Sequence, residues 1–165
     1  MSEPSLDAMV RRLDELESYV AIQQLVADYG NAFDHEDVGR LSRIWHDDAV
    51  LDVGEFGRYE GRDAILAAVK TLSEGVPEQH HWHANHSIDI DGDQATGLVA
   101  LDCAVTASEG GPHMVGGFYE DRYERRDGEW KIVSRVFTME YWTPIRGPLR
   151  EGVTNETLDR ASETS

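Results

Sequence analysis

Four long β-strand candidates follow one another in the second half of the chain, and this succession limits the fold more than any other feature. The candidates are residues 80–90, 95–107, 113–125 and 129–142. Two of the connections contain an Asp-Gly pair, at 91–92 and 127–128. Because Asp-Gly supplies the positive φ angles that tight hairpin turns require, we expect these segments to form an antiparallel meander.

The first half of the chain has the period of α-helices. Its apolar side chains recur at steps of three and four residues, as on one face of a helix. They are Leu6, Met9, Val10, Leu13, Leu16, Val20, Leu25, Tyr29 and Phe33. A periodic stretch of this length predicts a break or two helices, with the first turns covering the mouth of the domain or a neighbouring subunit.

Shorter elements fill the middle of the chain. Two further helices and, around Gly54, two short strands are predicted at residues 38–45, 62–72, 49–53 and 57–60 respectively. Helices therefore come first and hairpins last, which predicts an α+β fold with N-terminal helices packed on a curved, mostly antiparallel sheet. We place a single domain at 1–145. The tail, 146–165, is rich in Gly, Pro, Thr and acidic residues, so we expect it to be irregular or partly disordered.

Charge narrows the range of partners. The 165 residues include 15 Lys and Arg against 32 Asp and Glu, a net charge of −17 that repels phosphate backbones and anionic lipids. We therefore expect neither nucleic acid nor membrane partners. Cys103 is the single cysteine, so no intrachain disulfide can form, and residues 1–16 lack the apolar core of a secretion signal. A cytoplasmic location is expected.

Residues 80–86 read His-His-Trp-His-Ala-Asn-His, which places four of the seven histidines on one predicted strand. Strand alternation directs His81, His83 and Asn85 to one face. For His81 three interpretations are open: a general base, a structural core histidine and a metal ligand. A His-x-His pair needs further ligands to hold a metal, and the nearest downstream acid on this face, Asp89, is too distant, so we expect no metal site.

Several segments, taken in order, resemble the SnoaL-like branch of the nuclear-transport-factor-2-like superfamily. They are residues 21–34, 41–49, 57–61, 81–85, 117–130 and 139–144. Within this branch the chain looks most like a group of cofactor-free lyases, which includes lindane dehydrochlorinase, bile acid 7α-dehydratase and scytalone dehydratase. The resemblance implies a cone-shaped α+β barrel and a reaction that needs no cofactor.

The resemblance also implies a catalytic set. In those lyases a histidine paired with an aspartate removes a proton, and the matching positions are His81 and Asp34. Tyr29 and Arg135 match a nearby tyrosine and an arginine. By itself Asp34 has the position of a solvated helix end, and Tyr29 fits a core stripe equally well. Arg135 stands among apolar residues and requires a partner, for which Asp34, another carboxylate or an anionic part of the substrate are the candidates.

The side chains expected to contact substrate are Trp45, His83, Asn85, Phe118, Phe137 and Met139. They predict an apolar pocket for a small, aromatic or polycyclic molecule. The leading hypothesis is a cofactor-independent lyase or isomerase, with dehydration as the first reaction to consider. A binding module without catalysis and a polyketide cyclase are the alternatives.

Assembly is the last expectation. Tyr119, Tyr123 and Trp130 lie on long strands that a one-sided cone would leave partly exposed, and an exposed apolar patch usually marks an interface. We therefore expect a homo-oligomer formed through the outer sheet face, with a trimer favoured over a dimer, as the resemblance also implies.

Overall fold

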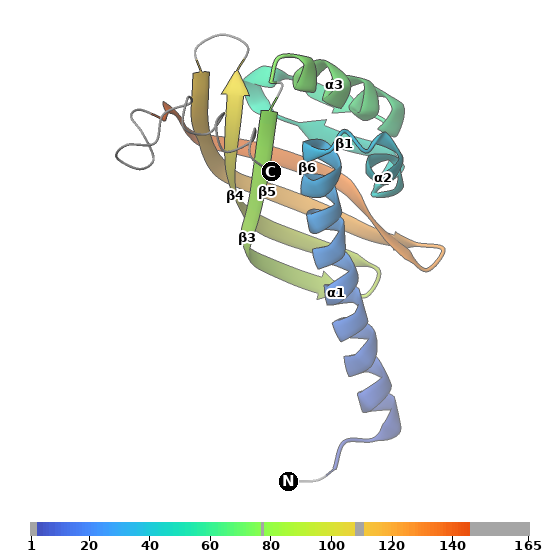
Figure 1. Ribbon diagram of the computed structural model, residues 1–165. Helices are drawn as coiled ribbons and strands as arrows, with labels where there is room; N and C mark the ends of the chain where they lie inside the picture. The colour runs from blue at the N-terminus through green and yellow to red at the C-terminus, as the bar shows by residue number, and fades with distance from the viewer. Residues whose placement is uncertain (1–2, 77, 108–110, 146–165) are drawn as a thin grey trace, which may run out of the picture.

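A curved six-stranded sheet carries the helices of this protein in the computed structural model, which describes residues 3–76, 78–107 and 111–145 (Figure 1). The helices in these ranges are α1 (Leu6–Asp34), α2 (Val38–Arg43) and α3 (Arg62–Glu74), together with a 3-10 turn, η1 (Gly54–Phe56). The strands are β1 (Trp45–Asp52), β2 (Arg58–Glu60), β3 (Glu78–Asp91), β4 (Gln94–Ala107), β5 (Gly111–Arg126) and β6 (Glu129–Pro144). The predicted tail, 146–165, lies outside the described residues.

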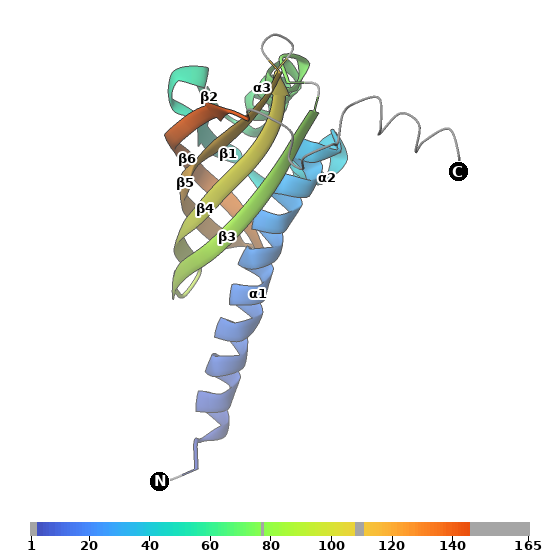
Figure 2. The same cartoon turned by 60° about the vertical axis from the view of Figure 1, so that its left-hand side comes forward.

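The strand order is β2-β1-β6-β5-β4-β3. All neighbouring strands are antiparallel except β1 and β6, which run parallel. The sheet curls around α1 but does not close within the described ranges, since β2 and β3 are its two edges (Figure 2). Gly92 and Gly128 adopt φ angles of 61° and 81° in the two predicted hairpin turns. The α+β fold with a mostly antiparallel sheet is therefore confirmed.

Two predicted element boundaries are wrong. Helix α1 is continuous for 29 residues, without the expected break, because it contains no proline and its second half packs along the sheet. The second helix ends at Arg43, and Trp45 already belongs to β1, where it pairs with Ile132. The Trp45 side chain is fully buried in the core, and this burial outweighs the local helical pattern.

A β-bulge changes which side chains of β3 lie on its half-buried side. The register shifts between Ala84 and Ser87, and Asn85 adopts a positive φ of 52°. One extra residue at a bulge reverses the inside–outside alternation that follows it. His86 therefore joins the half-buried side with His83, and the exposed Asn85 does not, so the substrate contact of Asn85 stays a prediction that this facing does not support.

The predicted exposed patch is also wrong. Tyr119, Tyr123 and Trp130 are only 1–8% exposed and belong to the hydrophobic core. Tyr119 and Tyr123 of β5 point toward the helices, because they alternate with outward residues such as Glu120, and Trp130 of β6 is buried with them. They cannot form an interface on the outer face. A homo-oligomer, and a trimer in particular, stays a prediction that these three residues no longer support.

Among the described helices none combines the length and the apolar character that crossing a bilayer requires.

Close packing of α1 on β3 depends on one glycine. A Cβ atom at Gly30 would lie 2.9 Å from two ring atoms of His83 and 3.5 Å from the Cβ of His81. No ordinary van der Waals contact is that short. The absence of a side chain at Gly30 therefore allows the helix to approach the strand that carries the histidines.

We expect Gly30→Ala to lower the free energy of unfolding by about 1–3 kcal/mol, because overpacking outweighs the ~1 kcal/mol that alanine gains in helix propensity. Denaturant titration measures this. Gly39→Ala in α2 is the matched control, since the nearest atom to its Cβ is a carboxylate oxygen of Asp37 at 3.4 Å, an ordinary van der Waals distance. Equal stability of the two variants would contradict the close contact.

Candidate active site

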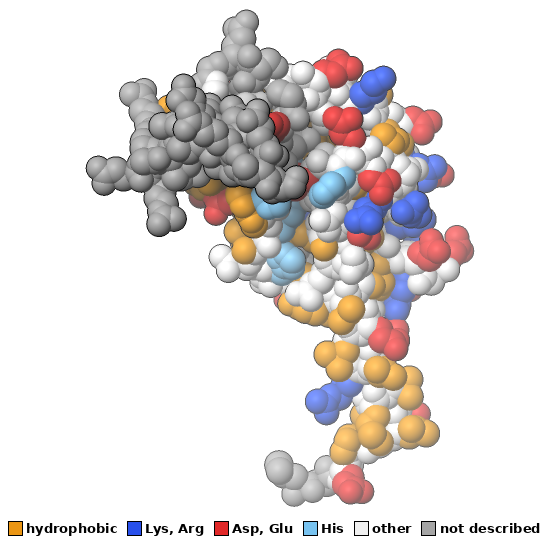
Figure 3. Space-filling model, in the orientation of Figure 1, with side chains coloured by type: hydrophobic (Ala, Val, Ile, Leu, Met, Phe, Trp, Pro, Cys, Tyr) orange, Lys and Arg blue, Asp and Glu red, His pale blue; other side chains and the backbone are white. Residues whose placement is uncertain are grey.

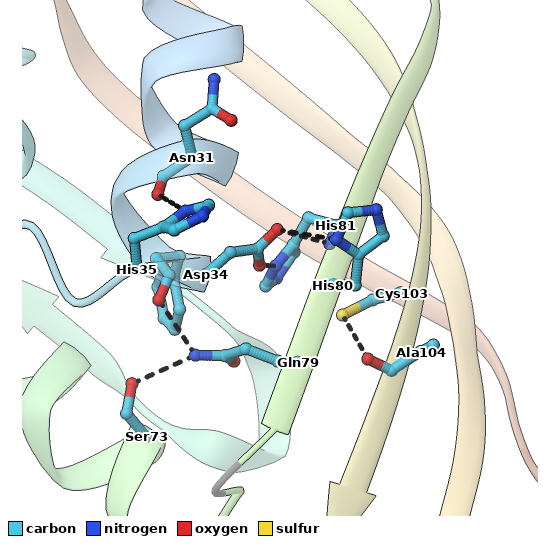
Figure 4. A network of polar contacts seen from close by, with 10 residues as sticks. Asn31, Asp34, His35, Ser73, Gln79, His80, His81, Cys103 and Ala104 are labelled. Carbon is cyan, nitrogen blue, oxygen red and sulfur yellow. Dashed lines mark hydrogen bonds and ion pairs between the residues drawn. The ribbon is translucent and has the colours of Figure 1, made fainter. Parts of the chain in front are cut away.

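Asp34 and His81 meet where α1 ends against β3. The Nδ1 of His81 lies 2.5 Å from Oδ1 of Asp34, and the backbone N–H of His81 donates to Oδ2 at 3.0 Å (Figure 4). The side chains are 9% and 7% exposed. The structure thus brings together two residues that are 47 positions apart in the chain. With Nδ1 facing the carboxylate, the other ring nitrogen, Nε2, is the one left to accept a proton.

Neighbouring contacts hold this pair in place. The side-chain amide of Gln79 donates to the backbone carbonyl of Phe33 at 3.1 Å and to Oγ of Ser73 at 3.3 Å (Figure 4). These bonds join the end of α1, helix α3 and the start of β3. The exposed His80 adds its Nδ1 at 3.5 Å from Oδ2 of Asp34.

The contacts with His81 control the charge of Asp34. Burial alone would raise the pKa of Asp34, but the hydrogen bonds from the side chain and backbone of His81 outweigh it and lower that pKa. Asp34 is therefore a carboxylate at neutral pH. A carboxylate in this position holds the imidazole in one orientation and stabilises its protonated form.

An apolar cavity of about 140 Å³ opens beside His81. Tyr29 and Phe137, two of the predicted site residues, line it. The other lining residues are Phe33, Val53, Phe56, Leu72, Val76, Gln79, Leu101, Cys103, Val105, Val115, Tyr119 and Trp142. Burial raises the pKa of the Cys103 thiol to about 12, so this side chain acts as an apolar wall.

Sequence reasoning missed most of these lining residues, although strand register could have found some of them. His81 pairs with Cys103, and Cys103 pairs with Val115. Residues directly opposite one another share a face of the sheet. The row that starts at His81 therefore points to two cavity residues once the pairing of β3, β4 and β5 is known.

The remaining predicted contact residues lie outside the cavity wall. Trp45 is fully buried in the hydrophobic core, and the partly buried Met139 packs against that core. Phe118 pairs with Ala100 and Thr138 on the opposite face of the sheet, because it alternates with the inward Tyr119. The substrate contact of Phe118 therefore stays a prediction that its position does not support.

Arg135 is completely buried and paired with Asp121. Its Nε and Nη2 donate to the two carboxylate oxygens at 2.8 and 2.7 Å, so the suggested pairing with Asp34 is wrong. The guanidinium carbon lies 4.2 Å from the ring centroid of Tyr29 and 4.4 Å from that of Tyr119. Burial alone would lower the pKa of Arg135, but Asp121 raises it, and the side chain is charged.

His83 lies between the dyad and this buried charge pair. Its ring stacks on that of His81 with centroids 5.9 Å apart. Burial first, and then the positive charge of Arg135, lower the pKa of His83 to about 2. His83 is therefore a neutral neighbour of the dyad.

A metal centre finds no support among these side chains, since the described residues contain no cluster of three or more His, Cys, Asp and Glu positioned to hold an ion. His81, one half of the His-x-His pair, is engaged with Asp34 instead.

The model of the SnoaL-like domain matches residues 14–136, which is most of the chain. The chain belongs to the SnoaL-like family. The resemblance noted in the sequence is thereby confirmed. Hexachlorocyclohexane dehydrochlorinase 1 of Sphingobium indicum is 33% identical over 138 residues, covering 82% of this chain and 90% of that enzyme. Uncharacterized protein Rv2910c of Mycobacterium tuberculosis is 29% identical and covers 81% and 92% of the two chains.

Solved structures agree with this assignment. A crystal structure of a hexachlorocyclohexane dehydrochlorinase superposes with a TM-score of 0.81 at 31% identity and covers 86% of this chain and 99% of its own. A putative scytalone dehydratase of Novosphingobium aromaticivorans has the same fold, with a TM-score of 0.72 at 20% identity and coverage of 86% and 97%. The similar enzymes at 31–33% identity are lyases.

The lowered pKa of His83 predicts how the stability of the folded protein depends on pH. The unfolded chain takes up a proton at this histidine below pH ~6.5, whereas the folded protein does not until about pH 2. Stability should therefore fall as the pH drops below ~6.5, by up to about 1.4 kcal/mol per pH unit. In denaturant titrations between pH 6 and 4, His83→Gln should lose less stability than the native protein, and the exposed-site variant His35→Gln should lose as much. Parallel curves for all three proteins would refute this assignment.

Proposed function

We propose that this protein is a cofactor-independent lyase that removes a proton from one carbon of a small apolar molecule and expels a leaving group from the next. The observation that carries the proposal is the 2.5 Å contact between His81 Nδ1 and the Asp34 carboxylate at the wall of an apolar cavity. A histidine held in this way is a competent general base.

In the proposed reaction Nε2 of His81 accepts the proton from carbon. The electrons of the broken C–H bond form the new double bond, and the leaving group departs with the electrons of its own bond. Asp34 stabilises the imidazolium that results. Carbon acid and leaving group are both parts of the substrate, so the elimination balances without a co-reactant.

Tyrosine hydroxyls supply assistance for the leaving group. Tyr29 and Tyr119 both line the cavity, and burial raises the pKa of each, so both are protonated hydrogen-bond donors at neutral pH. The charged Arg135 lies against both rings, and its Nη1 has no hydrogen-bond partner in the described protein. We assign these three residues to stabilising the negative charge that develops on the leaving group.

The volume of the cavity and the chemistry of the leaving group both indicate which substrate to expect. A cavity near 150 Å³ accommodates a molecule of about the size of benzene, which supports a single-ring substrate over a polycyclic one. Chloride departs without a proton, whereas hydroxide needs an acid. Together with the dehydrochlorinase relatives, this makes elimination of hydrogen chloride the first reaction to test and dehydration the second.

The same distance argues against the alternative of a binding module, because a ligand carrier has no need for a carboxylate-oriented base. Hydrogen-bond contact between the two side chains is what proton abstraction requires. Cyclisation and double-bond isomerisation use the same base, and product analysis separates them from elimination.

His81→Ala should lower kcat/KM for elimination at least ~10²-fold, about 3 kcal/mol of barrier, because it removes the base. Asp34→Asn should cost nearly as much, and the double variant little more than either alone, because the two residues act as one unit. Chloride release from γ-hexachlorocyclohexane and water loss from single-ring β-hydroxy ketones measure this. His35→Ala removes an exposed histidine next to Asp34 and should retain native rates.

Folding of each variant is checked by its thermal midpoint, so that loss of structure is not mistaken for loss of the base. Native rates in folded His81→Ala would refute the mechanism. No elimination by the native protein from either substrate class would refute the function.

Chelation gives an independent prediction. Because the dyad supplies the base without an ion, turnover should be unchanged after incubation with EDTA and dialysis. Lost turnover that a divalent ion restores would transfer His81 from the role of base to that of ligand.

A further inference from the structure

The first half of α1 projects from the body of the protein (Figures 1 and 2). The residues of α1 buried against the sheet begin only at Ser18. Before and just after that point the helix exposes large apolar side chains, each 48–72% accessible: Leu6, Met9, Val10, Leu13, Leu16 and Val20. Figure 3 shows apolar side chains gathered along this projecting segment.

These side chains do not continue the face that packs on the sheet. At 100° per residue, the residues of α1 that bury against the body, such as Ser18, Ile22 and Tyr29, cluster on one side of the helix. The exposed apolar residues fall on the opposite side. Arg125 of β5 fixes this orientation, since its guanidinium donates to both carboxylate oxygens of Asp14, at 2.7 and 3.2 Å. This contact therefore turns the apolar side of the first half of α1 away from the body of the protein.

The spacing of the exposed residues is that of a coiled coil. Leu6, Leu13 and Val20 are seven residues apart and occupy positions a, while Met9 and Leu16 occupy positions d. We call these five residues the heptad stripe. A seven-residue repeat is the pattern by which one helix packs along another, and a face that only shields a globular core has no need of it.

Charges beside the heptad stripe match a second copy of the same helix in parallel. Arg12 is at position g and Glu17 at the following position e, the two positions that meet across a parallel, in-register pair. Both are exposed, and within the described part of the chain neither has an ion-pair partner. An antiparallel pair would instead bring Arg12 of the two copies toward each other.

We propose that the heptad stripe is an interaction surface for a second copy of this chain, forming a parallel, in-register, two-stranded coiled coil. The partner covers the outward apolar side of α1, and Arg12 of each copy pairs with Glu17 of the other. The packed second half of α1 nucleates the helix, so the projecting half does not bear the full cost of helix formation. The association leaves the cavity beside His81 free.

Mass measurement tests the surface. Sedimentation of the full chain at tens of micromolar should give twice the 18.5 kDa of a single chain, and Leu13→Glu with Leu16→Glu should reduce it to one. Both positions are exposed, so folding should be unaffected, which the thermal midpoint verifies. A single-chain mass for the native protein, or an unchanged mass for the variant, overturns the proposal. A native mass of three chains overturns the two-stranded arrangement.

Charge exchange tests the pairing. Arg12→Glu and Glu17→Arg should each raise the dissociation constant of the pair at least ~10-fold, and the combined exchange should restore it, because opposite charges meet again. Arg11→Glu makes the same charge change one residue away, on the side of the helix opposite the heptad stripe, and should have little effect. Equal effects of Arg11→Glu and Arg12→Glu overturn the assigned contacts.

Cross-linking tests the register. Cysteines at the same d position of a parallel pair face each other, so Leu16→Cys should form a disulfide between copies under mild oxidation. Arg11→Cys should not, and the native chain offers only the buried Cys103. Cross-linking of Arg11→Cys as fast as that of Leu16→Cys overturns the in-register arrangement.

Discussion

The Asp34 carboxylate stabilises the fold and the candidate site at once. Strand β3 is an edge of the sheet, so half of its backbone groups have no neighbouring strand among the described residues. Asp34, at the end of α1, accepts the backbone N–H of His81 and also contacts its imidazole. The same contact covers part of an open edge and orients the imidazole of His81. Because α1 must approach this closely, a glycine is required at position 30, and the position of the cavity follows from that packing.

Charge is placed behind the cavity wall as well as in it. An isolated guanidinium would be too costly in this interior, but Arg135 is satisfied on one side by Asp121 and lies against two tyrosine rings. A hydroxyl of Tyr123 donates to the same carboxylate at 2.6 Å. Burial, and after it the positive charge of Arg135, keeps His83 neutral. Apart from His81, these charged and titratable groups lie behind the cavity wall, and the lining itself is mostly apolar.

Helix α1 is apolar on two opposite sides, in different parts of its length. Its second half buries one side against the sheet, and its first half exposes the other. This division explains why the sequence shows one long helical period although the helix serves two surfaces. It also explains why no break is needed where α1 leaves the body of the protein. The helix backbone continues unchanged, and only the side that carries the apolar residues differs between the two halves.

Local properties of the chain were sufficient to predict the order of helices and hairpins, since helical period and the positive φ of Asp-Gly turns act over a few residues. The pairing of His81 with Asp34 was predicted from the family resemblance, because 47 residues of intervening chain carry no spacing signal. Tertiary structure decided the rest. The bulge at Asn85, the partner of Arg135 and the inward facing of Tyr119 depend on which residues of neighbouring strands lie opposite one another. A shift of one residue in that register turns every following side chain to the other face, and only packing of the whole sheet against the helices selects among the registers.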